Sequence, residues 1–368
     1  MKRKIVAVLA LLVGVINAFA DIKVSDVKVF SGYPWKEVVV GYTITGTTNV
    51  SVVVGLSATD QTANKTYVAG KLSGAETLPG RHIMKWDAFG DGVKLRSEKT
   101  VFSVKISDPM YCIVDLSGGA NAASYPVSYA YGIPGGSQAN EYKTTKLILR
   151  RLEAGSFVMQ GVASATLTRP FYIGIFEVTQ KQWKQVMGSD SYSGSPVWGN
   201  GDAYPVRDVS YDMIRGGNSP FSAASSNSFI GKLQAKTGLD FDLPTEAQWE
   251  YACRAETRTT YYWGDSIDED YAWYHSNAGL SSHPVGAKEP NGWGLYDMIG
   301  NVGEYCLGWY GTLSYGLDPL GPLSGDLKVA RGGNFGSEEG DCTSSSRLSS
   351  YGRTGSMTCG FRVAQKIK

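Results

Sequence analysis

The stretch that decides the fold is "GLYDMIGNVGEYC", which runs from Gly294 to Cys306. It lies in a region, from Arg258 to the C-terminus, that has almost no long segment of helical or strand periodicity. Irregular backbone over about a hundred residues is unusual in a compact domain. We therefore expect ions, disulfides or aromatic packing to hold these loops.

The composition of the whole chain agrees with a loop-rich fold. The 368 residues include 45 Gly, 22 Tyr and 9 Trp, which suits irregular loops packed on large flat side chains. A formal net charge of +1, with no basic block, argues against a nucleic-acid partner. Three histidines (His82, His275 and His283), without HExxH or CxxC, are too few for a zinc enzyme or a three-histidine iron site. The length favours two domains.

The N-terminus predicts export. Three cations at positions 2–4 precede an apolar run from Ile5 to Ile16, and small residues stand at Ala18 and Ala20. We interpret residues 1–20 as a signal peptide cleaved after Ala20, because the run is short for a membrane span and no cysteine follows it to carry a lipid. Cleavage would change the formal net charge from +1 to −2. The expected product is secreted, periplasmic or cell-surface, with no membrane span.

Three further ranges follow, and together they predict an α+β protein. Residues 21–108 carry alternating strand signals such as "VVVGYTITG" and "TVFSVKI", which favour an immunoglobulin-like β-sandwich with Trp86 as a core aromatic. Residues 109–145 are rich in Gly, Ser, Ala and Tyr and are interpreted as a connecting segment. Residues 146–368 mix strands with three helical patterns, for which Thr179 is an N-cap, Gly238 an end and Pro244 a start.

Seven motifs of the third range stand in the order of one known family. They are "FYIGIFEVTQKQW", "YPVRDVSYDM", "FDLPTEAQWEYACR", "YYWGD", "HPVGAKEPNGWGLYDMIGNVGEYC", "VARGGNFG" and "CGFRVA". Residues 146–368 thereby resemble the formylglycine-generating enzyme, or sulfatase-modifying factor, family. The resemblance implies a loop-rich fold related to C-type lectins and an activity that oxidises a cysteine of a substrate protein.

The resemblance also implies a calcium loop. Asp297 and Glu304 would supply carboxylate oxygens, and Gly300 and Val302 would supply backbone carbonyls, which is the hard-oxygen set that Ca²⁺ prefers. Taken without the resemblance, the D-x-x-G-x-x-x-E spacing would be an ordinary turn with two solvated acids.

The copper site implied by the resemblance is incomplete. Family members bind Cu(I) through two cysteines in C-x4-C spacing, whereas "NFGSEEGDC" has Cys342 at the second position and Ser337 at the first. A serine hydroxyl is a hard, protonated donor that does not replace a thiolate on Cu(I). In addition, Gly303 stands where the family has a groove tryptophan, and Asn334 where a serine is common. Cys342 remains the catalytic candidate, without its copper partner.

The cysteines admit another interpretation in an exported protein. An oxidising compartment permits disulfides. We expect Cys306 and Cys342 to form a structural disulfide rather than a metal pair, and Cys253 and Cys359 could form a second, leaving Cys112 free. The pairing itself is left open by the sequence.

A binding function is the alternative to catalysis. Residues 334–359 are dense in Ser, Gly, Arg, Tyr and Thr, and resemble the variable region of lectin-fold proteins diversified by retroelements. Asn334, Phe335 and Ser337 are the predicted ligand-binding residues, with an exported protein, a peptide or a glycan as partner. A surface loop whose sequence has diverged without a binding function would have the same composition. Arg331 and Arg362 are expected to bond carbonyls or carboxylates structurally.

Overall fold

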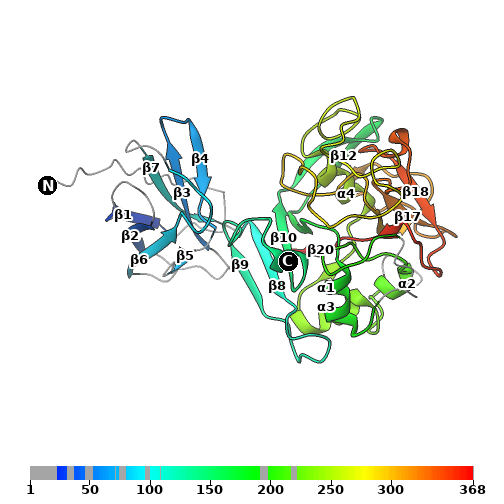
Figure 1. Ribbon diagram of the computed structural model, residues 1–368, viewed down its shortest axis with the longest axis horizontal. Helices are drawn as coiled ribbons and strands as arrows, with labels where there is room; N and C mark the ends of the chain where they lie inside the picture. Colours follow the sequence, from blue (N-terminus) through cyan, green and yellow to red (C-terminus); the bar gives the residue numbers. More distant parts are fainter. Residues whose placement is uncertain are drawn as a thin grey trace. The chain divides into compact units, whose positions relative to one another are not determined.

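A computed structural model describes most of the chain, and the predicted signal peptide of residues 1–20 lies outside the described part. The described residues are 23–30, 37–45, 53–70, 72–73, 80–95, 100–107, 109–190, 198–216 and 222–367. The chain divides into a smaller unit, Met1–Cys112 with Ser128–Ala139, and a larger unit, Ile113–Val127 with Asn140–Lys368 (Figure 1). Within these ranges, no helix is both long and apolar enough to cross a membrane.

The smaller unit contains two antiparallel sheets. The first has the order β1-β2-β6-β5, with β1 Lys23–Val29, β2 Glu37–Thr45, β6 Gly80–Asp87 and β5 Leu72–Ser73. The second has the order β4-β3-β7, with β4 Lys65–Val68, β3 Val53–Asp60 and β7 Thr100–Ser107.

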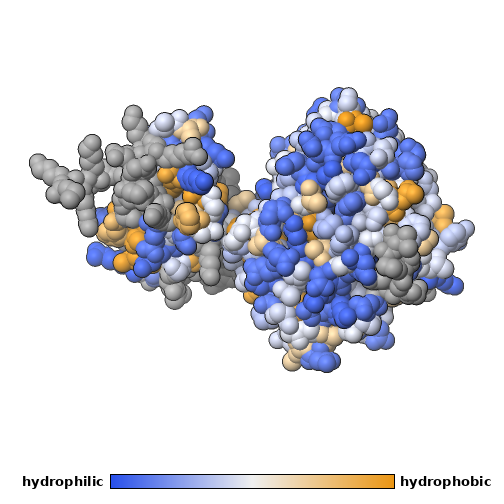
Figure 2. Space-filling model, viewed as in Figure 1, coloured by the Kyte–Doolittle hydropathy of each residue, from blue (hydrophilic) through white to orange (hydrophobic). Residues whose placement is uncertain are grey.

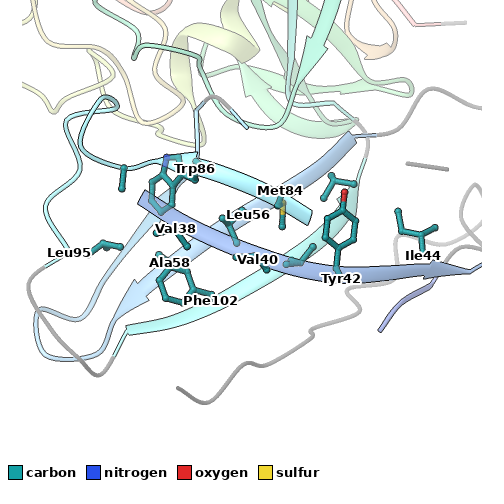
Figure 3. Packing of buried hydrophobic residues seen from close by; sticks show 14 residues of the cluster. Val38, Val40, Tyr42, Ile44, Leu56, Ala58, Met84, Trp86, Leu95 and Phe102 are labelled. Carbon is teal, nitrogen blue, oxygen red and sulfur yellow. The ribbon is translucent and has the colours of Figure 1, made fainter. Parts of the chain in front are cut away.

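One buried cluster joins these two sheets. Alternate residues of β2, among them Val38 and Val40, meet Phe102 of β7, as expected for strands with one buried face (Figure 3). Trp86 is fully buried in this cluster, and its indole N–H donates to Asp91 at 2.7 Å. The prediction that Trp86 is a core aromatic is confirmed, and its one polar group is satisfied.

The range predicted as a connecting segment, 109–145, has its own structure. It contains β8 (Tyr111–Asp115), β9 (Val127–Ala130) and the 3₁₀ helix η1 (Asn140–Lys143). The first four residues of β8, "YCIV", are buried, and so is Tyr142 of η1. A strand-length apolar run is therefore present, although the surrounding Gly and Ser residues obscure its pattern.

The larger unit is rich in sheet and has short helices. A six-stranded sheet has the order β14-β20-β13-β10-β8-β9, with β14 Phe241–Asp242, β20 Ala364–Lys366, β13 Phe171–Gly174 and β10 Lys146–Leu152. Its last two strands, β8 and β9, belong to the larger unit only in part, since the division between the units falls within each of them. A three-stranded sheet has the order β11-β12-β16, with β11 Gly155–Met159, β12 Ala163–Leu167 and β16 Gly316–Leu317. A four-stranded sheet has the order β18-β17-β15-β19, with β18 Arg347–Ser350, β17 Lys328–Arg331, β15 Gly303–Trp309 and β19 Cys359–Gly360.

The helices of this unit are α1 Gln180–Met187, α2 Tyr211–Ile214, α3 Phe229–Thr237, α4 Glu246–Arg254 and the 3₁₀ helix η3 Glu339–Asp341. Together with the sheets they confirm an α+β, sheet-rich architecture. Most of the visible face of this unit is hydrophilic, with hydrophobic residues in small separate patches (Figure 2).

Local capping signals set the helix ends. Thr179 caps α1 in a capping box with Gln182, and Gly238 ends α3 in the left-handed conformation, as predicted. The start of α4 differs slightly from the prediction, because Thr245 is the N-cap and Pro244 lies one residue before it. Proline fits there because its missing N–H is outside the helix.

Candidate functional site

The stretch from Gly294 to Cys306 is a loop that leads into β15. Its backbone takes positive φ at Asp297 (53°), Gly300 (82°) and Asn301 (54°). A Cβ on Gly300 would lie 2.3 Å from the carbonyl oxygen of Trp273, so only glycine fits there. The side chain of Asn301 donates to Glu177 Oε2 at 2.7 Å. The loop is thus fixed by a polar contact to Glu177 and by close packing against Trp273, both outside the loop.

Glu304, a predicted calcium ligand, forms a buried ion pair. Arg362 donates to its two carboxylate oxygens at 2.5 and 2.6 Å, and the Trp249 indole N–H donates at 2.8 Å. Glu304 and Arg362 are both fully buried or nearly so. The prediction that Arg362 binds a carboxylate structurally is confirmed.

Two further buried acids lie near this pair. Asp297 accepts the backbone N–H of Gly286 at 2.6 Å. Burial raises the pKa of Asp297 to about 6, and the charge of Glu304 adds to the effect against the lowering influence of Arg362. Burial, together with the charges of Asp297 and Glu304, holds the pKa of Glu177 well above its usual range. The charge of Arg362 therefore acts on three carboxyl groups, of which Glu304 is the one bonded to it.

The structure does not place these acids as a set of metal ligands. Among the residues it describes, no group of three or more His, Cys, Asp or Glu side chains is placed to hold a metal ion. Calcium binding by Asp297, Gly300, Val302 and Glu304 stays a prediction.

The fold brings Ser337 and Cys342 together, as the C-x4-C spacing predicts. Their side chains are in hydrogen-bonding contact, and Cys342 Sγ also donates to the Asn334 carbonyl at 3.9 Å. A Cβ on Gly333 would lie 2.6 Å from Cys342 Sγ, so the chain packs tightly here. Burial raises the pKa of Cys342 to about 12. The thiol is therefore protonated at neutral pH, and its neighbour is a hydroxyl.

Two of the three predicted ligand-binding residues are buried. Phe335 is 1% exposed, packs in a small cluster with Val302, and faces the Trp198 ring at 6.2 Å. Asn334 is 8% exposed, and its side-chain oxygen accepts the Gly336 N–H at 2.9 Å. These two side chains support the loop, and Ser337 is the partly exposed member of the three.

The expected disulfides are not formed. All five cysteines (Cys112, Cys253, Cys306, Cys342 and Cys359) are buried and free, so neither the Cys306–Cys342 pair nor the Cys253–Cys359 pair is present. Cys306 Sγ is directed to the Glu304 carbonyl (3.7 Å) and Cys253 Sγ to that of Met298 (4.0 Å). Burial raises the pKa of each thiol. They behave as small buried side chains.

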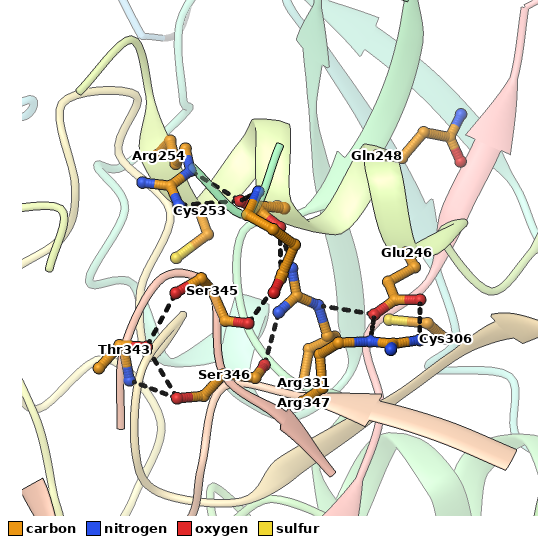
Figure 4. A network of polar contacts seen from close by, with 12 residues as sticks. Glu246, Gln248, Cys253, Arg254, Cys306, Arg331, Thr343, Ser345, Ser346 and Arg347 are labelled. Carbon is orange, nitrogen blue, oxygen red and sulfur yellow. Dashed lines mark hydrogen bonds and ion pairs between the residues drawn. The ribbon is translucent and has the colours of Figure 1, made fainter. Parts of the chain in front are cut away.

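An arginine–carboxylate network supports the segment that carries Ser337 and Cys342. Arg331 of β17 pairs with Glu250 and donates to the Ser346 carbonyl at 2.5 Å, which confirms its structural role. Arg347 of β18 contacts both oxygens of Glu246, at 2.5 and 3.0 Å (Figure 4). The network ties α4 to β17 and β18, on the two sides of residues 332–346.

Sequence reasoning missed the two acids of this network. Glu246 and Glu250 stand four residues apart on α4, so they face the same side of the helix. Their spacing among the apolar residues of "TEAQWEYACR" was the available signal.

The outer part of the segment offers exposed side chains of mixed chemistry. Beyond β18, Tyr351 is 70% and Met357 50% exposed, and Arg353 and Thr354 are also exposed. We call Tyr351–Met357 the terminal loop. It is the exposed end of the region that the composition predicted as a binding surface.

Comparison with known proteins supports the family resemblance. The sulfatase-modifying factor enzyme 1-like domain matches residues 130–367. The formylglycine-generating enzyme of Streptomyces coelicolor is 28% identical over 313 residues, which cover 79% of this chain and 88% of that protein. The mouse enzyme is 37% identical over 111 residues, or 25% of this chain and 30% of the relative. Among solved structures, Treponema denticola variable protein 1 matches with a TM-score of 0.52 and 26% identity, over 61% of this chain and 96% of its own.

Proposed function

The chain belongs to the sulfatase-modifying factor family, and from that premise we propose that it is an exported ligand-binding member that does not generate formylglycine. One observation carries the proposal: Cys342 is a lone, buried and protonated thiol, and Ser337 occupies the partner position. Cu(I) prefers two thiolate ligands. The Ser337 hydroxyl and a Cys342 thiol with a pKa of about 12 do not supply such a pair at neutral pH.

The exposed terminal loop supports a binding function. Tyr and small polar residues make adaptable contact surfaces, as in antibody loops. Treponema denticola variable protein 1, by its name a variable protein, is similar in structure over 61% of this chain at 26% identity. We propose an exported protein or peptide as the ligand, contacted by Tyr351, Arg353 and Met357; a glycan is the other candidate class.

Two finer features of the fold belong to the same proposal. The orders β1-β2-β6-β5 and β4-β3-β7 match the A-B-E-D and C′-C-F strands of an immunoglobulin sandwich, which supports an immunoglobulin-like smaller unit. The family implies a C-type-lectin-like larger unit. Export follows from the signal-peptide pattern of residues 1–20.

A test of the missing activity compares the mature protein with its Ser337→Cys variant. Each is incubated with Cu(I), O₂ and a peptide that contains the sulfatase Cys-x-Pro-x-Arg motif, and the peptide mass is measured. We expect no aldehyde from the natural chain. We expect tighter Cu(I) binding by Ser337→Cys, because that variant has two adjacent thiols, and no such gain in Ser337→Cys/Cys342→Ser. Aldehyde formation by the natural chain would overturn the proposal.

We also propose that Ca²⁺ binds at the loop of residues 297–304. Glu177, Asp297 and Glu304 are buried, and the cations that act on them are Arg362 and, at Asp297, Lys143. One negative charge therefore remains in excess when all three acids are ionised. A divalent cation would offset that excess. The competing outcome is that Glu177 stays protonated, in line with its raised pKa, and that no cation is needed.

The donors at this loop fit calcium in chemistry. Asp297 and the carbonyls of Gly300 and Val302 are hard oxygen donors, whereas Glu304 is already paired with Arg362. We therefore expect Asp297→Asn to abolish a rise of the thermal midpoint on adding Ca²⁺, and Asp341→Asn, an exposed control, to retain it. A midpoint that is the same with calcium and with chelator would contradict the site and favour protonation.

A further inference from the structure

Lys328, the first residue of β17, holds its amine in an aromatic environment. The residue is only 3% exposed, and in the part of the chain that the structure describes its Nζ has no hydrogen-bond partner. Two rings face the amine instead, since Nζ lies 3.2 Å from the ring centroid of Trp309 and 4.2 Å from that of Tyr211. Cation–π contacts offset only part of the hydration that a buried ammonium loses.

The terminal loop covers the stem of this lysine. Ser350, the last residue of β18, pairs with Lys328 across the sheet, and the loop begins at the next residue. A Cβ on Gly352 would lie 2.9 Å from Lys328 Cγ and 3.4 Å from Tyr211 Cβ. The start of the loop therefore packs directly on the lysine and on α2, and its position there keeps water from the amine.

Two backbone hydrogen bonds tie the terminal loop to the segment that carries α2. The Asp212 N–H donates to the Gly352 carbonyl at 3.3 Å, and the Asp208 N–H donates to the Ser356 carbonyl at 2.8 Å. The loop itself is largely exposed. Exposed segments with few buried contacts open locally at a lower free energy than the rest of the protein. The amides of Asp208 and Asp212 therefore report whether the loop is packed or released.

The burial of the amine changes its titration. Burial lowers the pKa of Lys328 from its ordinary value of 10.5 to about 8, and the charge of Arg215 adds to the effect against the raising influence of Asp212. A released loop would return the amine to water and its pKa toward the ordinary value. Above about pH 8 the packed form therefore binds fewer protons than the released form, so a rising pH favours packing.

Groups on the other elements around the amine do not change charge in this pH range. Burial raises the pKa of the phenols of Tyr211, on α2, and Tyr305, on β15, so both stay protonated. Trp309 and Ser350, the residues that pair with Lys328 on β15 and β18, carry no titratable group. On the terminal loop, Arg353 is exposed, and its guanidinium stays charged.

We propose that Lys328 is a pH-sensitive latch of the terminal loop. With the amine neutral, the loop stays packed on β17 and α2. With the amine protonated, the ammonium gains hydration when the loop lifts away, so the loop is released more often. The proposal concerns the conformation of the loop and holds whether or not the loop binds a ligand.

Amide hydrogen exchange of the mature full chain tests the latch. The protection factor, which relates the exchange rate to that of an unstructured chain at the same pH, is measured for Asp208 and Asp212. We expect both factors to rise about tenfold between roughly pH 7 and pH 9, the change that pKa values of about 8 (packed) and 10.5 (released) impose on the opening equilibrium. The amide of Ile175, bonded to the Ile148 carbonyl at 3.0 Å, is the control and should not follow this rise. Unchanged protection at Asp208 and Asp212 would overturn the proposal.

Two variants separate titration from packing. Lys328→Met keeps an unbranched stem without a charge, so the two protection factors should be high and independent of pH. Lys328→Arg stays charged at both pH values, so the factors should be low at both. A tenfold rise with pH that persists in Lys328→Met would contradict the role of the amine.

A direct titration keeps the proposal testable if neither variant folds. The NMR shift of the Lys328 Cε in the natural chain should titrate with a midpoint near pH 8. A midpoint at the ordinary value of 10.5 would overturn the latch. None of these measurements uses a ligand, so their outcome is independent of the proposed binding function.

Discussion

At the scale of single residues, close contacts between side chains and backbone determine the geometry of the candidate site. Ser337 meets Cys342 because Gly333, with φ of 71°, lets the chain pass close to the sulfur. The C-x4-C position could be recognised from the sequence. The burial of Phe335 could not be predicted from the sequence, because its contacts, Val302 and Trp198, come from distant segments.

Gly333→Ala should destabilise the protein by about 1–3 kcal/mol, because the new Cβ would meet Cys342 Sγ at 2.6 Å and the Asp341 carbonyl oxygen at 2.8 Å in a left-handed conformation. Urea unfolding measures the loss. Gly340→Ala is the matched control, since a Cβ there meets nothing within 4 Å. A change within about 0.5 kcal/mol is expected for the control. Equal effects of the two variants would show that the close packing at Gly333 is unimportant.

The buried thiol of Cys253 predicts a pH dependence. Burial raises its pKa from 9.0 to about 12, so the native state holds this proton at pH values where the unfolded state has released it. The stabilisation is fully present below pH 9 and is lost as the pH rises toward 12. The difference in unfolding free energy between the natural chain and Cys253→Ala should therefore shrink by about 1.4 kcal/mol between roughly pH 8 and pH 10.

Urea unfolding at both pH values under reducing conditions measures this difference. The subtraction removes the contribution of the other thiols and tyrosines, which are the same in both proteins. A difference that does not change with pH would mean that the thiol is accessible to solvent.

At the scale of elements, α4 is the support for the strands that flank Ser337 and Cys342. Its start could be predicted from "LPTEAQW", and Thr245 caps it in a box with Gln248. Its partners could not be predicted from local pattern. Arg331 lies 81 residues from Glu250 along the chain, and Arg347 lies 101 residues from Glu246.

Glu250→Gln should lower the free energy of unfolding by about 3–5 kcal/mol. The substitution leaves two buried guanidinium groups, Arg331 and Arg254, without their shared carboxylate. The control is Asp190→Asn, which breaks the exposed Lys184–Asp190 pair and should cost less than about 1 kcal/mol. Chemical denaturation measures the free energy of unfolding of both variants. A small loss in Glu250→Gln would argue that the network contributes little to holding β17 and β18.

At the scale of the whole molecule, the chain builds two units with separate cores. The cluster around Trp86 is made only of residues from the smaller unit. The larger unit has its own sheets, short helices and buried ion pairs.

Trp86→Ala should therefore destabilise the smaller unit by about 3–5 kcal/mol, the usual cost of removing a large buried aromatic side chain. Hydrogen exchange should show faster exchange in β1 to β7 and unchanged protection in α4 and β17. Loss of protection in α4 and β17 as well would show that the two units unfold together.

The sequence by itself determined the features that depend on neighbours along the chain. Strand alternation, the caps at Thr179 and Gly238, and the ordered motifs of the family are all local patterns, and the α+β class and the family membership followed from them. Only the tertiary structure decided which charges meet. Glu304 pairs with Arg362, 58 residues away, and the five cysteines each remain a free thiol. Such pairings depend on distances between segments far apart in the sequence, and residue spacing does not encode those distances.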